Sequence, residues 1–273
     1  MGKPDSQPAT ISRLVAAAIA AHPSEGRFVA LAIRSDDPLA DVARVVFAES
    51  SGSDTATLIR EYVEYRSASL FFLVMDRKTG RPAGAGRVVE GGGRTLDDAP
   101  DRIGRDLSAI VAAHDLQDGK IWELAPVSVL PGYHGGRAGS TVSSLLYRTI
   151  LKAGRRAGVR HVVALLDQRA LRRMALLGIP FVPMAGSGPF EYRGSVTRAL
   201  YVPFAGLEPS IAEQGERLRR PGADFAGEIR ARGLCRLLTR RHAARRSAQV
   251  ATGTGLDEHI QLPGLDRRRL PTR

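Results

Sequence analysis

The sequence predicts an α/β fold built around a mixed sheet, and the stretch 120–167 provides most of the evidence. A strand over Ile121–Val129 leads into Pro131 and a glycine-rich turn, and a helix with apolar residues at helical spacing follows. A second strand covers His161–Asp167. Strand, helix and strand in this order form a βαβ unit, in which the two strands are parallel and the crossover is right-handed.

The segments before this unit predict a helix, a strand, two more helices and a hairpin. The hairpin is indicated by a turn around Gly80 between two apolar runs, which makes its strands antiparallel. In order, we expect a short amphipathic helix with Ile11, Leu14, Val15, Ala18 and Ile19 inward, a strand over Phe28–Ser35, a helix that starts near Asp36 or Asp37 and carries Leu39, Val42, Val45 and Val46, a helix over Asp54–Arg66, and strands over Ser69–Asp76 and Ala83–Glu90.

Residues 91–119 form an insertion, and the segments after the βαβ unit complete the sheet. Ile103, Leu107, Ile110 and Val111 indicate one short helix in the insertion. Ser140 or Thr141 can cap the helix of the βαβ unit at its start, and Gly158 suits its end. The later elements are a helix over Asp167–Leu177 ended by Gly178, and strands over Phe181–Met184, Phe190–Tyr192 and Val196–Phe204.

The glycine-rich turn is a candidate anion site. Gly132, Gly135, Gly136 and Gly139 precede a helix, and a turn of this kind directs several backbone N–H groups at one point near the positive end of the helix dipole. This arrangement favours phosphate groups. The alternative is a plain tight turn, which the glycines alone predict equally well.

At this point the chain resembles a family. The order strand, V-x-P-x-Y, basic glycine turn, amphipathic helix and G-V-x-x-V strand is similar to the donor-binding core of the GNAT acyltransferases, and WELAPVSVLPGYHGGRAGS stands where that family has its fourth strand and pantetheine-pyrophosphate loop. The resemblance spans about residues 28–204. It implies a mostly antiparallel sheet with one splayed parallel strand pair and helices on both faces.

The family's loop pattern, [Q/R]-x-x-G-x-[G/A], is matched only in part. Aligning on Gly139-Ser140 puts His134 at the Q/R position and Arg137 at the first glycine, whereas a shift of one residue gives Tyr133, Gly136 and Ala138. The helical insertion followed by E-L-x-x-V-x-V-x-P-x-Y narrows the resemblance to the acyl-homoserine lactone synthase and N-acyl amino acid synthase branch. That branch implies fatty acyl groups carried by acyl carrier protein.

The resemblance and the chemistry of acyl transfer together nominate site residues. The acceptor amine must lose a proton, and Glu123, on an apolar strand beside the only tryptophan, is the first candidate base, with His134 as the second. Pro126 indicates an interrupted strand ladder. The predicted donor-binding residues are Val127, Ser128, Val129, His134, Gly135, Gly136, Arg137, Ala138, Gly139 and Ser140, and the predicted pocket residues are Trp122, Tyr133 and Tyr192.

Each assignment has a structural alternative. Glu123 can be an edge carboxylate paired with an arginine, His134 a solvated loop residue, and Tyr133 and Tyr192 packing residues. Many members of the family have a tyrosine that protonates the departing thiolate, and here that position is Met174, so no general acid is assigned. The arginines near 155–160 complement the helix end, with an acidic carrier-protein surface as the alternative partner.

Composition limits the remaining possibilities. A single cysteine, Cys235, excludes an intrachain disulfide framework, and the six scattered histidines show no metal-binding spacing, so we expect no metal site. No apolar run reaches the length of a membrane span, and the predicted location is the cytoplasm. We expect three parts: an N-terminal helix or arm (1–27), the acyltransferase-like domain (28–210) and a basic tail (211–273).

The tail holds 14 arginines against 7 acidic residues and contributes strongly to the net charge of +12. One helix is expected in it, over Phe225–Ala244. A solvated tail is one interpretation, and contact with nucleic acid or an anionic membrane is the other. Phe225 is the tail's one aromatic residue, which speaks against base stacking.

The predicted function is transfer of an acyl group from a pantetheine thioester to a small-molecule amine. Acyl-CoA or acyl carrier protein would serve as a co-substrate, with no tightly bound cofactor. Two alternatives stay open: a GNAT-shaped module that senses an acyl ligand or binds a partner without catalysis, and a nucleic-acid-associated protein that acts through its arginine-rich tail.

Overall fold

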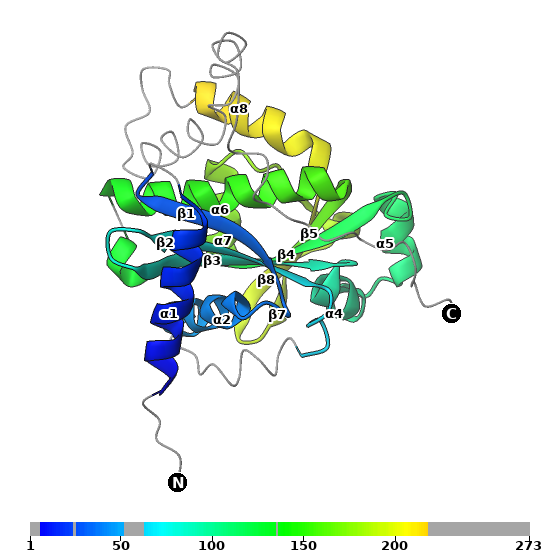
Figure 1. Ribbon diagram of the computed structural model, residues 1–273. Coiled ribbons are helices and arrows are strands. Elements are labelled where there is room, and N and C mark those ends of the chain that lie inside the picture. Colours follow the sequence, from blue (N-terminus) through cyan, green and yellow to red (C-terminus); the bar gives the residue numbers. More distant parts are fainter. Residues whose placement is uncertain (1–5, 24–25, 52–62, 135, 218–273) are drawn as a thin grey trace.

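The computed structural model describes residues 6–23, 26–51, 63–134 and 136–217 of the 273-residue chain. Its elements, shown in Figure 1, are α1 (Ser6–Ala21), β1 (Phe28–Arg34), α2 (Leu39–Ser51), β2 (Ser69–Asp76), β3 (Arg81–Glu90), α4 (Gly93–Ile103), α5 (Leu107–Ala113), β4 (Lys120–Val129), α6 (Gly136–Ala157), β5 (Val159–Asp167), α7 (Gln168–Leu176), β6 (Val182–Pro183), β7 (Phe190–Tyr192), β8 (Ser195–Pro203) and α8 (Leu207–Arg217), with short 3₁₀ turns at Pro131–Tyr133, Met184–Gly186 and Phe204–Gly206.

The strands form a single sheet in the order β1-β2-β3-β4-β5-β8-β6, with β7 paired to β8. Within the described residues, β4 and β5 are the parallel pair, and every other neighbouring pair is antiparallel. The predicted fold class, a mostly antiparallel mixed sheet with one parallel strand pair joined through a helix, is therefore confirmed.

Both faces of the sheet are buried, and β2 shows why its sequence is uniformly apolar. Side chains alternate between the two faces along a strand. Phe72 and Val74 pack under α6, whereas Phe71, Leu73 and Met75 pack against α1 and α2. Burial on both faces removes any need for polar residues, so SLFFLVMD is a continuous apolar run.

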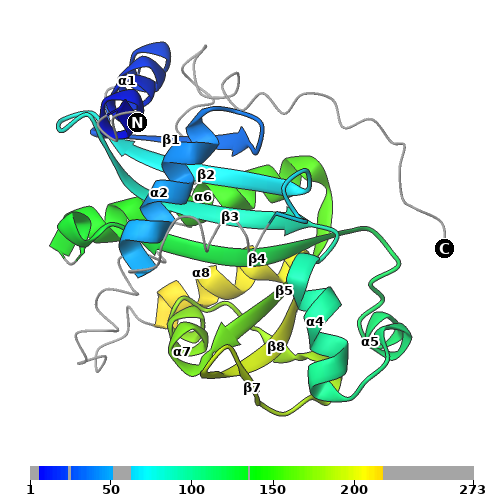
Figure 2. The ribbon, with the colours of Figure 1, turned by 90° about the horizontal axis from the view of Figure 1, so that it is seen from below.

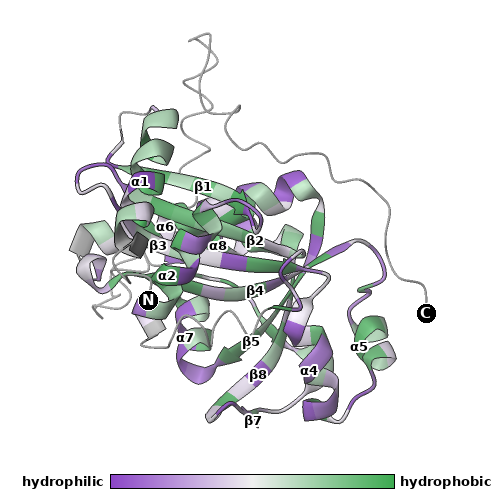
Figure 3. Ribbon diagram, turned by 60° about the horizontal axis from the view of Figure 1, so that its bottom comes forward, coloured by the Kyte–Doolittle hydropathy of each residue, from purple (hydrophilic) through white to green (hydrophobic). Residues whose placement is uncertain are grey.

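Helices cover the two faces as the resemblance implies. Figure 1 shows α6 and α8 over one face, and Figure 2, from below, shows α2 and α4 across the other. The apolar stripe of α6 includes Val142, Leu146 and Ile150, all buried in the main core. Figure 3 shows the strands mainly hydrophobic and α7 largely hydrophilic, as expected of a helix at the edge of the fold.

The insertion between β3 and β4 differs from its prediction. It contains two helices, α4 and α5, where one short helix was expected. Leu96 and Ala99 of α4 and Ile110 of α5 pack with Val163 of β5 and Ala199 of β8. The insertion therefore covers the end of the sheet that α2 leaves open. A Gly104 at left-handed φ of 63° separates the two helices, which the apolar spacing alone did not reveal.

The predicted helix caps at Ser140 and Thr141 are wrong. The helix α6 begins at Gly136, so both residues lie inside it, and the Ser144 hydroxyl donates to the Ser140 carbonyl one turn earlier. A Cβ at Gly139 would meet the Tyr133 carbonyl oxygen at 2.4 Å. The glycine at 139 therefore permits close packing of a helical turn on the preceding chain and does not indicate a loop.

Two other predicted helices fall largely or wholly beyond the described residues. Most of the Asp54–Arg66 helix does, and its last part, 63–66, forms bends and turns. The Phe225–Ala244 helix and most of the basic tail also lie outside them. α8 runs across the predicted boundary between domain and tail at residues 210 and 211, and its Ile211 is buried. Among the described residues no helix is long and apolar enough to cross a membrane.

Candidate active site between the splayed strands

The parallel strands β4 and β5 separate part of the way along. They pair only from Lys120 to Glu123, opposite residues 159–163. Beyond that point β4 continues along β3 to Val129, and β5 continues along β8 to Asp167. Figure 2 shows the two strands diverging. One edge of β4 after Glu123 therefore has no strand partner among the residues that the structure describes.

A β-bulge accompanies the separation. On β3, Gly86 and Val88 are two residues apart, but their partners on β4, Val127 and Leu124, are three apart. The extra residue lies at Ala125-Pro126. Proline has no N–H to give to a ladder, and a bulge bends and twists the strand that contains it. The interrupted ladder expected at Pro126 is thus confirmed, and it lies at the point of separation.

A cleft of about 420 Å³ occupies the space between the strands. Its wall combines both strands with α4, α6, α7 and the β7–β8 hairpin. Arg94, Arg173 and Arg193 give it a positive character, against the acidic Glu123 and Asp167. The remaining lining residues are Leu124, Ala125, Pro126, Val127, Tyr147, Leu165, Leu166, Ala170, Met174, Tyr192, Ser195 and Thr197.

Glu123 is the buried acid of this cleft, with 4% of its surface exposed. It lies on the sheet face covered by α4. Its Oε1 accepts hydrogen bonds from the Thr95 N–H at 3.1 Å and the Thr95 hydroxyl at 2.8 Å, and its Oε2 accepts one from the Arg94 N–H at 3.1 Å. The first turn of α4 thus directs its backbone donors at a carboxylate, which the helix dipole favours.

Burial raises the pKa of the Glu123 carboxyl above its ordinary value. The hydrogen bonds from Thr95 and from the Arg94 backbone, and the Arg94 charge, act in the opposite direction but do not cancel the effect of burial. Within the described part of the chain Oε2 accepts one hydrogen bond, which leaves it capacity for another. A buried carboxyl with a raised pKa in a cleft is a typical proton acceptor.

A run of three glycines brings α4 onto Glu123. Gly91, Gly92 and Gly93 all have positive φ, at 83°, 88° and 44°. A Cβ at Gly93 would lie 2.3 Å from Glu123 Oε2 and 2.9 Å from a Val89 methyl group. Only glycine combines this backbone conformation with so close an approach. The run was noted in the sequence merely as part of an insertion, although three glycines before a helix could have indicated a tight contact.

Tyr192, predicted to line the pocket, lies in the cleft wall. Its hydroxyl donates to Asp98 and accepts from the Arg94 guanidinium, which stands 5.7 Å above the Tyr192 ring centre. Burial and the Asp98 carboxylate raise the pKa of Tyr192. These contacts fix Tyr192 and Arg94 together at the side of the cleft nearest Glu123.

The structure does not place Trp122 in the cleft. Successive strand residues face opposite sides of the sheet, so Trp122 lies under α6 while its neighbour Glu123 faces α4. Trp122 lines a separate apolar cavity of about 40 Å³, whose wall shares Leu124 and Tyr147 with the cleft. Its indole N–H has no hydrogen-bond partner in the described part of the chain.

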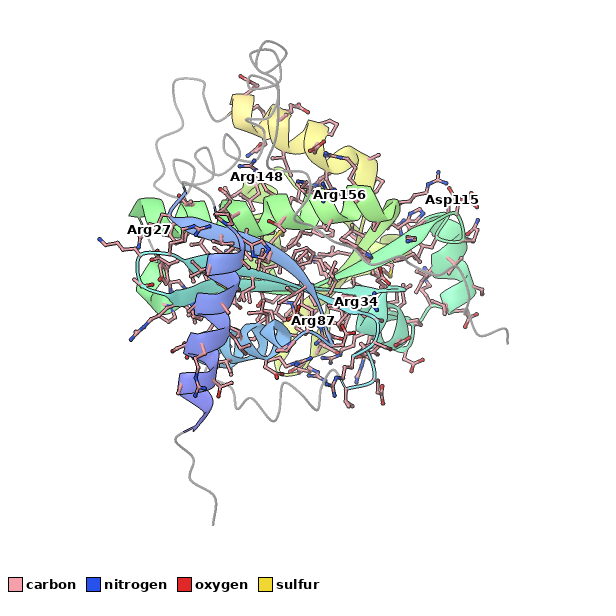
Figure 4. All side chains as sticks on the ribbon, in the orientation of Figure 1. Arg27, Arg34, Arg87, Asp115, Arg148 and Arg156 are labelled. Atoms are coloured by element: carbon pink, nitrogen blue, oxygen red, sulfur yellow. The ribbon has the colours of Figure 1, made fainter. Side chains whose placement is uncertain are left out.

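Tyr133 also lies away from the cleft wall. Its hydroxyl donates to Asp76 at 3.1 Å and lies 3.0 Å from the Thr79 hydroxyl, and its ring packs edge-on against Phe28. Arg27 completes this group through two hydrogen bonds to Asp76. Figure 4 shows Arg27 at the β1 end of the sheet, far from Asp115 beside α5. These contacts are those of a packing residue, which is the alternative to a place for Tyr133 in the pocket.

Of the predicted donor-binding residues that the structure describes, only Val127 lines the cleft. Ser128 and Val129 pair with β3, and the exposed His134 donates from Nε2 to the Val129 carbonyl at 2.6 Å, since a carbonyl can only accept. His134 is therefore not brought together with Glu123. Ala138, Gly139 and Ser140 are half-buried in the first turns of α6. Gly135 and the side chain of Arg137 lie outside the described residues.

Two cleft residues from the helices add further chemistry. Met174 of α7, for which the resemblance implies a tyrosine in many members of the family, is buried, and its Sδ lies 4.0 Å from the hydroxyl of Tyr147 on α6. Tyr147 is not among the site residues predicted from the sequence. In the described residues no group of histidine, cysteine, aspartate and glutamate side chains could hold a metal ion.

No protein-family model matches the chain, and no curated protein matches it. Solved structures do resemble it. FeeM, an N-acyl amino acid synthase from uncultured soil microbes, is 12% identical with a TM-score of 0.49, and the match covers 67% of this chain and 94% of FeeM. BjaI, a CoA-dependent acyl-homoserine lactone synthase with SAM and isopentyl-CoA, is 16% identical with a TM-score of 0.45, covering 75% of this chain and 98% of BjaI.

A third structure, the acyl-homoserine lactone synthase LasI, is 11% identical with a TM-score of 0.44, and the match covers 65% of this chain and 90% of LasI. These three structures are acyl-homoserine lactone synthases and an N-acyl amino acid synthase, the two kinds of enzyme that the sequence resembles. At such identities and TM-scores, their activities and the roles of their residues do not transfer to this chain.

Proposed function

We propose that the protein transfers an acyl group from a pantetheine thioester, acyl-CoA or acyl carrier protein, to an amine. One observation carries the proposal: a cleft opens where two parallel strands separate, and a buried carboxylate with a raised pKa lies in its wall. Acyl transfer needs a carbonyl-polarising donor and a base for the amine, and a backbone N–H of β4 and the Glu123 carboxylate would fill these roles.

The uncovered edge of β4 would receive the thioester. After Glu123 the backbone on this edge has no β5 partner, so N–H groups of the Leu124–Val129 segment are available to an extended ligand. An N–H directed at the thioester carbonyl would stabilise the negative charge that develops on its oxygen. The pantetheine arm would then lie along β4 as an added strand.

Glu123 would accept the proton of the amine. Its Oε2 faces the first turn of α4 and retains acceptor capacity, and its raised pKa brings it closer to neutral pH, where a base works best. Arg94, Arg173 and Arg193 would attract the anionic donor into the cleft. The donor phosphates or an acidic carrier surface would benefit from this field.

Two measurements test the proposal. Titration calorimetry with acetyl-CoA, longer acyl-CoAs and acyl carrier protein should detect binding of at least one, and a thiol-release assay against a panel of amines should detect turnover. Glu123→Gln should lower kcat by about 100-fold or more at unchanged fold, in the range that removal of a general base causes. Glu191→Gln, at an exposed position on β7, is the matched control and should retain full turnover.

Absence of binding to all of these donors would overturn the proposal. Unchanged turnover of the Glu123→Gln variant would remove Glu123 from the mechanism while leaving the transfer reaction in place.

A second function, ligand binding without catalysis, is favoured by one observation. Glu123 accepts three hydrogen bonds from Arg94 and Thr95, which is also what a structural carboxylate does when it anchors a helix. In that case acyl-CoA would bind with measurable heat, and no amine in the panel would release thiol.

A further inference from the structure

Tyr147 places a phenol in the cleft wall at the junction of two helices. It lies on α6, which crosses the sheet face above β4 and β5, and it lines both the cleft and the smaller apolar cavity. Its hydroxyl donates toward Met174 Sδ on α7, at 4.0 Å. The two helices therefore bring an O–H group and a sulfur atom together at the cleft.

Among the described residues, the partner of this hydroxyl is the Met174 thioether. A thioether is a weak hydrogen-bond acceptor, and 4.0 Å is a long contact even for sulfur. In the smaller cavity Tyr147 has Leu124, Ile150, Leu151 and other apolar residues as neighbours. Polar groups withdrawn from solvent nearly always have a good partner, so a half-buried phenol left with a thioether suits a ligand atom that arrives later.

The other phenol of the cleft is already engaged. The Tyr192 hydroxyl accepts from Arg94 and donates to Asp98. Of the two phenols, Tyr147 is the one whose O–H is directed at a sulfur atom. Burial raises the pKa of Tyr147 to about 12, although the nearby Arg173 acts to lower it, so the O–H keeps its proton throughout the neutral range.

We propose that the Tyr147 hydroxyl donates a hydrogen bond to the sulfur of the donor thioester and stabilises that sulfur as it departs. This inference rests on the proposed acyl transfer. Met174 Sδ marks the place of a sulfur acceptor in the unliganded cleft, and the thioester sulfur would take it over. Tyr147 is then a catalytic residue that α6 supplies, whereas the family's tyrosine would belong to α7.

In the acyl-transfer step, the amine nitrogen forms a bond to the carbonyl carbon, the carbon–sulfur bond breaks, and its electron pair stays on sulfur. The pKa of an alkyl thiol is about 8.5, well below that of Tyr147, so the phenol stabilises the thiolate by a hydrogen bond and retains its own proton. The proton released by the amine passes through Glu123 and water, and the thiolate takes up one proton from water to become the thiol.

Tyr147→Phe tests the role because it removes only the hydroxyl. The loss of one hydrogen bond to a charged atom should lower kcat about 10- to 100-fold for an alkyl thioester such as acyl-CoA. An aryl thioester leaves as a more stable thiolate and needs less help, so the variant should turn it over within about twofold of the wild-type protein. This dependence on the leaving group is one that a purely structural tyrosine would not produce.

Tyr201→Phe is the matched control. The Tyr201 hydroxyl lies 3.2 Å from His161 Nδ1, and Tyr201 is not among the residues of the cleft wall. The kcat of the Tyr201→Phe variant should fall no further with the alkyl thioester than with the aryl thioester. Equal losses on alkyl and aryl thioesters in Tyr147→Phe, or no loss, would overturn the inference while wild-type turnover upholds the proposed function. Absence of turnover in the wild-type protein with either donor would reject both.

Discussion

The Thr95 hydroxyl donates a 2.8 Å hydrogen bond to Oε1 of Glu123, and so joins the first turn of α4 to the centre of the sheet. Both residues are buried, and the Thr95 N–H donates to the same oxygen. The insertion between β3 and β4 is therefore part of the site, because it supplies the donors that hold the cleft carboxylate and moderate its pKa.

Thr95→Val should raise the pKa of Glu123 further, since the Thr95 hydrogen bond opposes the effect of burial. A base works in its ionised form, so the acidic limb of the rate–pH profile should move to higher pH. The variant should also lose about 1.5–3 kcal/mol of folding free energy, as expected when a hydrogen bond to a charged group is removed. Thr95→Ser keeps the hydroxyl and should leave the limb in place. If the acidic limb of the rate–pH profile does not move in Thr95→Val, the Thr95 hydroxyl does not influence the pKa of Glu123.

Gly93→Ala should damage both stability and turnover. The new Cβ would lie 2.3 Å from Glu123 Oε2 on a backbone with φ of 44°, so α4 or the carboxylate must shift. We expect a loss of about 2–4 kcal/mol in urea unfolding, from backbone strain together with overpacking. Gly80→Ala is the control, since Gly80 has φ of 65° with nothing within 4 Å and should show the strain alone. Equal losses in the two variants would mean that the contact with Glu123 contributes nothing.

The sequence was sufficient to predict the elements in which regularly spaced apolar residues extend over many positions. The βαβ unit, the β2–β3 hairpin and the parallel pair follow from apolar spacing and turn residues, which are local properties. The separation of β4 and β5 is what the resemblance implies, and Pro126, which cannot take part in a ladder, is consistent with it. Glu123 was selected because it is a carboxylate in an apolar context, and the structure places it in the cleft wall, whereas its role as a base stays a prediction.

What the sequence missed depends on side chains that meet across long separations. Arg94 and Thr95 approach Glu123 only because three left-handed glycines turn the chain, and left-handed φ is not visible in a run of letters. Trp122 and Tyr133 are predicted pocket residues that do not lie in the cleft wall. Alternation along β4 puts Trp122 on the opposite face, and the turn at 131–133 carries Tyr133 to the hairpin at Asp76.

The Asp76 carboxylate should matter for stability more than any exposed acid. It is fully buried at the end of β2, and burial alone would raise its pKa, but hydrogen bonds from Arg27, the Lys78 N–H and Tyr133 outweigh burial and lower it. A lowered pKa means that the contribution to stability is complete above the ordinary value of about 3.9 and is lost as the pH falls through the folded-state pKa.

Asp76→Asn should therefore cost about 1–3 kcal/mol in urea unfolding at pH 7, since an amide cannot accept all of these hydrogen bonds. The difference from the wild-type protein should shrink below about pH 3.9. Asp36→Asn is the control, because Asp36 is exposed and pairs with Arg34 at 3.6 Å, and such surface pairs contribute little. A difference that stays constant from pH 7 to pH 3 would contradict the lowered pKa of Asp76.

Glu123 should show the opposite dependence of stability on pH. Its folded-state pKa is raised, so between the ordinary value of about 4.3 and the folded value the unfolded chain loses its proton while the folded protein keeps it. The folded state then binds more protons, and the free energy of unfolding falls as the pH rises through this interval. Glutamine does not titrate, so the stability of the wild-type protein relative to Glu123→Gln should decline as the pH rises above about 4.3 and then level off.

Urea unfolding of both proteins across this range measures the difference, with Glu191→Gln as a control that should show no such decline. A difference that grows with pH would mean that the hydrogen bonds from Arg94 and Thr95 stabilise the carboxylate more than burial destabilises it, and that Glu123 is fully ionised in the resting cleft.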